Sequence, residues 1–518
     1  MKKYAIGFPV IILIILISSY SFGSGEISKE DIESIIEEKL KLDLNRYNII
    51  IDYEEDNYSN KPKWNVKLTG KEGNSDNINI IIEENNNTVN IIKLHRYRNS
   101  YYTGKTRIDN NTAKKIANDF FQALNPNKVD KVKCVPNDNL YFYETYAQGP
   151  IKYRFKYVME YKGIPFPQNM IEITVNGGDG NIDNYFSSWK NIKLPSPNNI
   201  IDRKRATELL KGNSRMSLIY KPVYKGNNIN KGIERFILIY YPEKKGYGID
   251  AKTGEFINYD MEYKKIKLPL DVLGKVNENK PKKVRSKEKA KLLAKKYLNF
   301  KNDSVKLKSI DRLKNSDLWN IRFNLSIDEM EVEGFLQISS NTGKLINYHI
   351  DDYNSKINSS ITWEEGLKTS LALIGKFNSS KRGNIEKEIV KHDDAYYVNG
   401  EKVENRYYKY YFRRVLNGIP VGSNGISVRI DKHTGNITDY NVLWNDLNEN
   451  LDNKIISKKE ALNRYFKKNE VSLRYILINN IYDDKKKLKL VYTIYNPSYS
   501  VMDAKKGVFI DYKGNIIE

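Results

Sequence analysis

The pattern of apolar and polar positions along the chain alternates between two periods. Short stretches with apolar residues three and four positions apart predict helices. Each is followed by runs in which apolar and polar residues alternate, as in half-buried antiparallel strands. The expected helices span residues 28–42, 112–124, 203–210, 286–298, 362–377 and 457–466. The pattern therefore predicts an α+β chain in which each of six modules has one helix packed on a small antiparallel sheet.

The first expected helix shows how its start is encoded. Ser28 and Asp31 form the spacing of a capping box, in which the N-cap side chain and the third helical residue satisfy each other's backbone N–H groups. Ile32, Ile35 and Leu40 then follow at helical spacing. Several of the other expected helices also begin with Ser, Thr or Asp at a suitable N-cap position.

An internal repeat sets the domain organisation. The segment 163–189 shares ten identities over 27 positions with the segment 418–444, at a constant offset of 255 residues. Further matches extend outward: Tyr240 aligns with Tyr495, and His95 aligns with His349 at an offset of 254. The chain after its first 25 residues is therefore predicted to be two tandem copies of one three-module unit. The expected segments are 26–108, 109–195 and 196–264 in copy one, a basic linker at 265–284, and 285–355, 356–448 and 449–518 in copy two.

Glycines recur where the expected strands reverse direction. A hairpin turn needs a residue with positive φ, which glycine adopts without steric cost. We interpret these glycines as turn residues, since none opens a helix after a strand as a phosphate-binding loop does. They are Gly180, Gly254, Gly343, Gly435, Gly507 and Gly514.

The N-terminus has the pattern of a targeting segment. Lys2 and Lys3 precede an apolar run at 4–17, and small residues follow near 18–25. This order is typical of a secretory signal peptide, and the run is shorter than the ~20 residues of a membrane span. Residues 1–25 are therefore expected to direct export as a signal peptide, with an N-terminal membrane anchor as the alternative. Localisation is predicted to be secreted or extracytoplasmic.

Charge and cysteine content narrow the classes of partner. The 518 residues carry a formal net charge of +22, which favours polyanions such as an anionic cell wall polymer or a membrane surface. A lysine-rich genome explains the same charge without a function. No DNA- or RNA-binding motif occurs, so no specific nucleic acid partner is predicted.

Cys134 is the single cysteine, so no intrachain disulfide can form.

The sequence offers no recognisable catalytic or metal-binding motif. We therefore predict no catalytic residues, no cofactor and no metal site. Six residues that recur in the two copies are candidates for ligand binding, with packing inside or between modules as the alternative role. They are Trp189, Trp444, Tyr185, Tyr440, His95 and His349.

The repeated residues resemble a known family. The segment with Gly418-Ile419-Pro420, Thr434-Gly435-Asn436 and Trp444 looks like the YcdB/YcdC repeated domain of Gram-positive bacteria. A helix followed by a sheet that closes on an Asp-x-x-Thr-Gly hairpin resembles PepSY-type modules. Copy one departs from this pattern at 176–179, where Asn, two Gly and Asp stand in place of 431–434.

The resemblance implies a non-enzymatic role, because that family has no established catalytic activity. PepSY modules occur in propeptides of secreted peptidases and in partners of wall-lytic enzymes, so the chain is expected to bind, inhibit or chaperone a secreted peptidase or cell-wall hydrolase. Two alternatives stay open: a structural protein of the cell wall retained by its charge, and an enzyme with an unrecognised site.

Overall fold

The computed structural model describes two compact units. It describes residues 27–517 except 55–61, 86–87, 99–104, 136–149, 226–231, 244–246, 259–263, 269–282, 299–304, 314–315, 328–329, 352–359, 392–394, 399–400, 446–453, 479–486, 496, 498 and 512. The predicted targeting segment at 1–25 lies outside the described residues. The first unit combines Met1–Asn198 with Leu473–Val491, and the second combines Asn199–Ser472 with Tyr492–Glu518.

Helices occur at all six expected places. They are α1 (Lys29–Leu40), α2 (Asn110–Leu124), α4 (Arg203–Asn213), α5 (Lys287–Leu298), α6 (Trp363–Phe377) and α7 (Lys458–Lys468). The predicted capping box of α1 is confirmed: Ser28 Oγ accepts from Asp31 N at 3.1 Å, and Asp31 Oδ2 accepts from Ser28 N at 2.8 Å. Thr362 and Glu365 form the same box on α6. Short 3₁₀ turns lie at Leu44–Arg46, Pro126–Lys131 and Ser379–Asn384.

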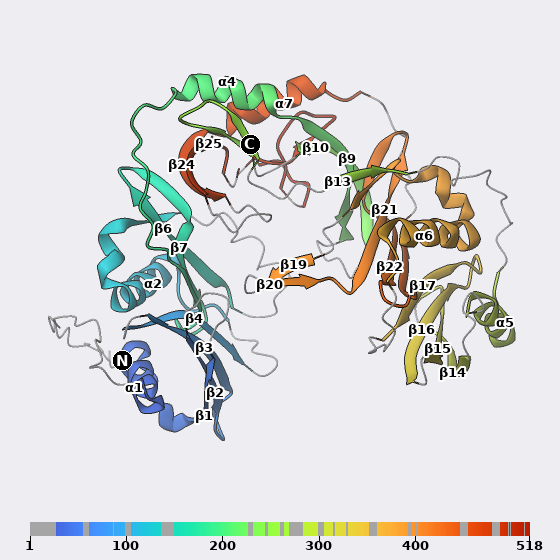
Figure 1. Ribbon diagram of the computed structural model, residues 1–518, viewed down its shortest axis with the longest axis horizontal. Coiled ribbons are helices and arrows are strands. Elements are labelled where there is room, and N and C mark those ends of the chain that lie inside the picture. The colour runs from blue at the N-terminus through green and yellow to red at the C-terminus, as the bar shows by residue number, and fades with distance from the viewer. Residues whose placement is uncertain are drawn as a thin grey trace, which may run out of the picture. The chain divides into compact units, whose positions relative to one another are not determined.

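The first unit contains one eight-stranded antiparallel sheet (Figure 1). Its order is β1-β2-β3-β4-β8-β7-β6-β5. The strands are β1 (Tyr47–Glu54), β2 (Lys63–Gly70), β3 (Asp76–Asn85), β4 (Thr88–Arg98), β5 (Val132–Val135), β6 (Lys152–Tyr161), β7 (Ile164–Asn176) and β8 (Ile182–Ser188). Buried residues of α1 and α2 share one core with the sheet, so the first two modules of copy one are joined along β4 and β8.

The second unit repeats this arrangement for copy two. β14 (Val305–Arg312), β15 (Leu318–Ile327), β16 (Met330–Ser339) and β17 (Leu345–Ile350) form a meander that joins β23 (Ile437–Leu443). β22 (Ile419–Asp431) pairs with β23 and with β21 (Tyr407–Leu416). Helices α5 and α6 share one core with these strands. Two short pairs are β13 (Lys264–Lys267) with β18 (Glu388–Lys391), and β19 (Ala395–Val398) with β20 (Glu401–Glu404).

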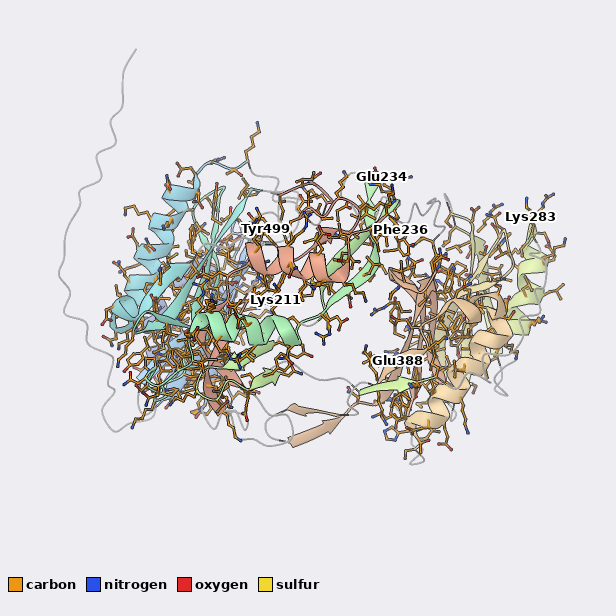
Figure 2. All side chains as sticks on the ribbon, turned by 90° about the horizontal axis from the view of Figure 1, so that it is seen from above. Lys211, Glu234, Phe236, Lys283, Glu388 and Tyr499 are labelled. Carbon is orange, nitrogen blue, oxygen red and sulfur yellow. The ribbon has the colours of Figure 1, made fainter. Side chains whose placement is uncertain are left out.

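The third modules depart from the contiguous modules expected at 196–264 and 449–518. β9 (Met216–Tyr224) and β10 (Ile233–Pro242) continue the sheet of the second unit beyond β22, and β26 (Met502–Asp503) pairs with β10. Their buried residues pack with those of α7 in a separate core, where Figure 2 labels Phe236 and Tyr499. The remaining strands are β11 (Tyr247–Asp250), β12 (Phe256–Asn258), β24 (Ser472–Ile478) and β25 (Lys487–Thr493). An apolar hairpin pattern repeated in both copies cannot specify which helix covers it.

The repeated Gly-Ile-Pro motif marks a tight hairpin. Lys162 and Gly163 have φ of 51° and 75°, and Asn417 and Gly418 have φ of 51° and 77°. Positive φ at both central residues is the geometry of a type I′ turn, whose twist matches antiparallel strands. Within the part of the chain that the structure describes, no helix combines the length and apolar character needed to cross a membrane.

Candidate functional site

A row of side chains crosses five strands of the second copy in register. Phe335 on β16 lies opposite His349 on β17, which lies opposite Asp439 on β23. Asp439 in turn lies opposite Arg429 on β22, and Arg429 lies opposite Lys409 on β21. Residues directly opposite each other in antiparallel strands have Cβ atoms ~5 Å apart, so their side chains interact.

The row lies on the face of the sheet away from the helices. Successive residues of a strand point to opposite faces. The neighbours Tyr348, Tyr410 and Tyr440 are at most 1% exposed in the core, and Tyr410 Oη donates to Trp363 O of α6 at 2.8 Å. A second, parallel row lies two residues along the strands. It consists of Asn347, Asn441, Ser427 and Tyr411. Together the two rows line a groove of about 630 Å³.

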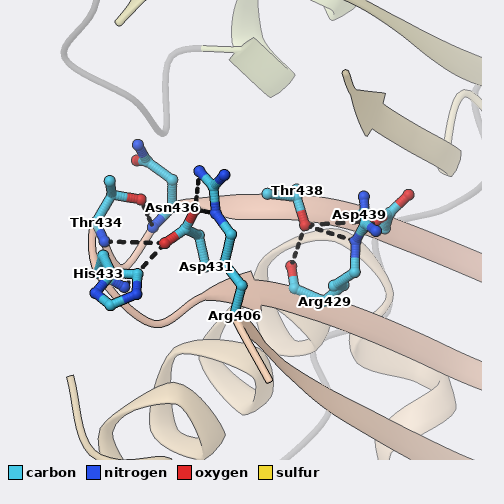
Figure 3. A network of polar contacts seen from close by, with 8 residues as sticks. All are labelled: Arg406, Arg429, Asp431, His433, Thr434, Asn436, Thr438 and Asp439. Carbon is cyan, nitrogen blue, oxygen red and sulfur yellow. Dashed lines mark hydrogen bonds and ion pairs between the residues drawn. The ribbon is translucent and has the colours of Figure 1, made fainter. Parts of the chain in front are cut away.

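Asp439 is the polar centre of this groove. Its Oδ1 lies 2.7 Å from Nδ1 of His349, and its Oδ2 forms an ion pair with Nε of Arg429. Arg429 Nε also donates to Thr438 Oγ1 at 2.9 Å (Figure 3). The other ring nitrogen of His349, Nε2, lies 3.3 Å from Asp351 Oδ1. Both nitrogens of the imidazole thus face carboxylates, which holds the ring in place but directs it at no nucleophile.

Lys409 supplies a cation without a counter-charge. It is exposed and faces the groove directly beside Arg429, which forms an ion pair with Asp439. Among the described residues Lys409 has no ion-pair partner. Like charges directly opposite each other in a sheet are destabilising. An anionic group bound at this end of the groove would therefore relieve a repulsion that the free protein retains.

The same positions in copy one carry different chemistry. His95 Nδ1 lies 2.5 Å from Oδ1 of Asn184, which replaces the aspartate, and Thr174 replaces Arg429. Arg154 stands where copy two has Lys409, but it pairs with Glu172 at 3.4 Å. The backbone register is shared, while the paired carboxylate at the centre and the unpaired cation at the end occur in copy two alone.

The recurring tyrosines are buried hydrogen-bonding residues. Tyr185 and Tyr440 are 1% and 0% exposed. The side-chain amides of Asn125 and Asn378 donate to their phenolic oxygens at 3.0 and 2.9 Å. Burial raises the pKa of the Tyr185 phenol above its ordinary value, which strengthens its preference for the protonated form. Neither tyrosine reaches a surface where a ligand could bind.

The recurring tryptophans lie beneath lysines. Lys128 Nζ is 5.0 Å from the ring centroid of Trp189, and Lys381 Nζ is 5.1 Å from that of Trp444. Both indole rings pack against the cores beside them. Arg414 also lies over the Trp444 ring, at 4.9 Å. Cations already cover part of each ring, which favours packing over ligand binding for these two candidates.

Asp431 organises the turn that closes the second copy's sheet. Its Oδ1 accepts from the backbone N–H groups of His433 and Thr434 at 2.9 and 3.2 Å. Its Oδ2 accepts from Nε of Arg406 at 2.9 Å (Figure 3). The Asp-x-x-Thr-Gly sequence is therefore scaffold, and the backbone N–H of His433 is one of the groups that Asp431 binds.

The sequence patterns identified one residue of the groove, His349, as a candidate. The recurrence of His95 and His349 marked them as candidates. His349 lies in the row, and His95 lies at the equivalent position of copy one. Lys409, Arg429 and Asp439 were missed, because their strands are assembled from separate segments and the residues do not recur in copy one. Within the described residues, no group of three or more His, Cys, Asp or Glu side chains could hold a metal ion. Burial raises the pKa of the half-buried Cys134 thiol, which disfavours the nucleophilic thiolate.

Comparisons with known proteins agree with the duplication. The sequence model of the YcdB, YcdC repeated domain matches twice, at residues 44–189 and 315–444. Among solved structures, the Bacillus megaterium YpeB C-terminal domain aligns with 16% identity and a TM-score of 0.27, covering 44% of this chain and 96% of that one. No curated protein matches the sequence. Since the two family matches span more than half of the 518 residues, the protein belongs to the YcdB/YcdC repeated-domain family.

Proposed function

We propose that the protein is an exported, non-catalytic binding protein of a Gram-positive cell surface. Its groove in copy two would bind an acidic polypeptide segment of a secreted peptidase or cell-wall hydrolase, and thereby inhibit, chaperone or retain that enzyme. The observation that carries this proposal is the cross-strand row that ends in Lys409, a cation beside a second cation and without a carboxylate of its own.

The groove suits a polypeptide better than a dense polyanion. Besides Lys409 it presents the side chains of Asn347, Asn441 and Ser427, which can hydrogen-bond peptide groups. Phe335 adds an aromatic surface at the opposite end. Asp439 lies at the centre, and its negative charge would repel a continuous row of phosphates.

The non-catalytic part of the proposal rests on the chemistry of the row. Acid–base catalysis needs a side chain poised beside the reacting group. His349 instead has its ring nitrogens beside Asp351 and Asp439. Arg429 is engaged by Asp439 and Thr438. These contacts support a binding surface whose charged groups are fixed in position.

The test uses the chain from residue 27 immobilised as bait for proteins of the culture medium. Wild type, Lys409→Glu and the matched control Lys67→Glu would be compared. Lys67 is an exposed lysine on β2 of the first unit, so its variant has the same change in net charge. We expect a peptidase or wall hydrolase, identified by mass spectrometry, to be retained by wild type and by Lys67→Glu. Retention by Lys409→Glu should fall at least tenfold, and equal retention by all three proteins would contradict the proposal.

Retention on the cell wall by charge is a second candidate, favoured by the net charge of +22. Binding to purified wall should then weaken steeply between low and high salt, because exposed charges are screened within about 10 Å at 0.1 M ionic strength. Lys409→Glu and Lys67→Glu should weaken it equally, since each changes the net charge by the same amount. An effect confined to Lys409→Glu would instead favour the groove.

A further inference from the structure

We infer that the two copies are interlocked because their third modules exchange strand residues. In this arrangement β9–β10 of copy one completes the module of α7, and Tyr492 and Thr493 of copy two complete the backbone contacts of the α4 module. Each copy then supplies an element that the other needs, so copy one and copy two are folding partners within one chain.

The first half of the exchange is visible in the core around α7. Met216, Tyr220 and Phe236 of copy one are buried with Ala461 and Tyr465 of α7. These five side chains are at most 6% exposed. The apolar face of the β9–β10 hairpin is therefore covered by a helix that begins more than 200 residues later in the sequence.

Backbone and side-chain hydrogen bonds fix the same connection. β10 pairs with β26 through Tyr240 opposite Met502, and Ala504 N donates to Leu238 O at 2.9 Å. Tyr240 Oη donates to the carbonyl oxygen of Ile456, just before α7, at 2.9 Å. In a contiguous module, β10 would instead lie beside β11 of its own copy.

The reciprocal half is visible around α4. This helix packs on β11 and β12 of its own copy. Two residues at the end of β25 in copy two complete the contacts: Tyr492 Oη donates to Ile201 O at 3.0 Å, and Thr493 Oγ1 donates to Tyr247 O at 2.7 Å.

The two halves are related by the internal repeat. Ile201 and Ile456 are equivalent at the offset of 255 residues, and their N–H groups donate to Ala251 O and Ala504 O at 2.8 and 2.9 Å. Each carbonyl receives a tyrosine hydroxyl from the other copy. The structural counterpart of Tyr240 is thus Tyr492, which corrects the alignment of Tyr240 with Tyr495.

The first modules take no part in the exchange. The first module of each copy keeps its four strands in one contiguous meander, β1–β4 with α1 and β14–β17 with α5. With a single cysteine in the chain, no disulfide joins the copies. Strand pairing and the shared core around α7, rather than the inter-copy segment alone, hold them together.

Cysteine pairs in the full chain, in a Cys134→Ser background, test which strand lies beside β10. Ile239 pairs with Asp503 across β10 and β26, so the double variant Ile239→Cys with Asp503→Cys should oxidise to a disulfide. The matched control is Ile239→Cys with Asp250→Cys, because Asp250 is the repeat equivalent of Asp503. The control pair would cross-link only in contiguous modules. Cross-linking of the control pair but not of 239 with 503 would overturn the exchange.

A second measurement needs no cysteines. A protease recognition sequence inserted after residue 275 allows the folded chain to be cut between the copies. We expect the two fragments to co-elute at the mass of the uncut chain in size-exclusion chromatography with light scattering, and to separate in denaturant. Separation of the fragments under native conditions would overturn the interlock even if the cysteine variants fail to fold.

Discussion

The side-chain amide of Asn378 donates to the phenolic oxygen of Tyr440 at 2.9 Å, inside the core of the second unit. Asn125 and Tyr185 repeat this relationship in the first unit at 3.0 Å. Leaving a buried polar group without its partner costs about 1–3 kcal/mol. We expect Tyr440→Phe to lower the free energy of unfolding by that amount, measured by denaturant titration.

Tyr185→Phe should have an effect of similar size, because the same amide–phenol contact is lost. The control is Tyr161→Phe, a tyrosine that is 39% exposed on β6. Its effect should stay within about 0.5 kcal/mol, as for most surface substitutions. Equal stability of all three variants would show that the buried contact adds no net stability.

Gly366 is required where α6 crosses β21. A Cβ atom at this position would meet the Tyr410 ring, with Cζ at 3.1 Å and Oη closer still. That ring is buried and hydrogen-bonded to Trp363 O, so it cannot move aside freely. Overpacking a core typically costs about 1–3 kcal/mol. Gly366→Ala is therefore expected to lower the free energy of unfolding.

The same substitution at Gly212 provides the control. Gly212 lies in α4, and a Cβ there would meet no atom within 4 Å. Ala is favoured over Gly in a helix by up to about 1 kcal/mol. Gly212→Ala should therefore stabilise the protein, and a loss of stability for both variants would argue against the packing explanation for Gly366.

Lys128 should make the free energy of unfolding depend on pH in the alkaline range. Burial lowers the pKa of its ammonium group to about 8, below the unfolded value of 10.5. Between these two values the unfolded chain binds more protons than the folded chain, so the free energy of unfolding rises with pH. Lys128→Met should reduce this rise between pH 8 and 10, measured by denaturant titration at each pH. The control is Lys67→Met, and an identical profile for wild type and Lys128→Met would contradict the prediction.

Asp439 should limit how strongly the groove attracts anions. Asp439→Asn gives copy two the residue that copy one has at Asn184, and it removes the counter-charge of Arg429. We expect an acidic peptide to bind several-fold more tightly to this variant at low salt, measured by isothermal titration calorimetry. The gain should shrink at 0.5 M salt, since screening then acts within about 4–5 Å. Weaker binding would mean that Asp439 positions Arg429 for the ligand.

Short-range sequence signals predicted the helix starts and the hairpin turns well. The side chains of Ser28 and Asp31 cap α1 as their spacing predicted. Gly435 has φ of 67°, as its expected place in a turn requires. Such features depend on a few residues close together in the sequence, where backbone sterics and unpaired N–H groups leave few alternatives.

Long-range pairing could not be predicted in the same way. The hairpins of both copies show the same alternation of apolar and polar residues. The pattern therefore could not predict the hydrogen bond from Tyr240 to Ile456. The groove posed a related difficulty. Lys409 and Asp439 become neighbours of Arg429 only through the register of three strands. Recurrence between the copies identified His349, but it could not identify groove residues that differ between the copies.

The exchange also determines the order in which parts of the chain can fold. Tyr240 precedes Ile456 by 216 residues, so β9–β10 is synthesised long before the helix that covers it. At ~5–20 residues per second, that interval lasts roughly 10–40 s. During this time the apolar face with Tyr220 and Phe236 lacks its native cover. A chain arrested before α7 would therefore expose an aggregation-prone strand pair, which makes the last 60 or so residues decisive for the solubility of the first half.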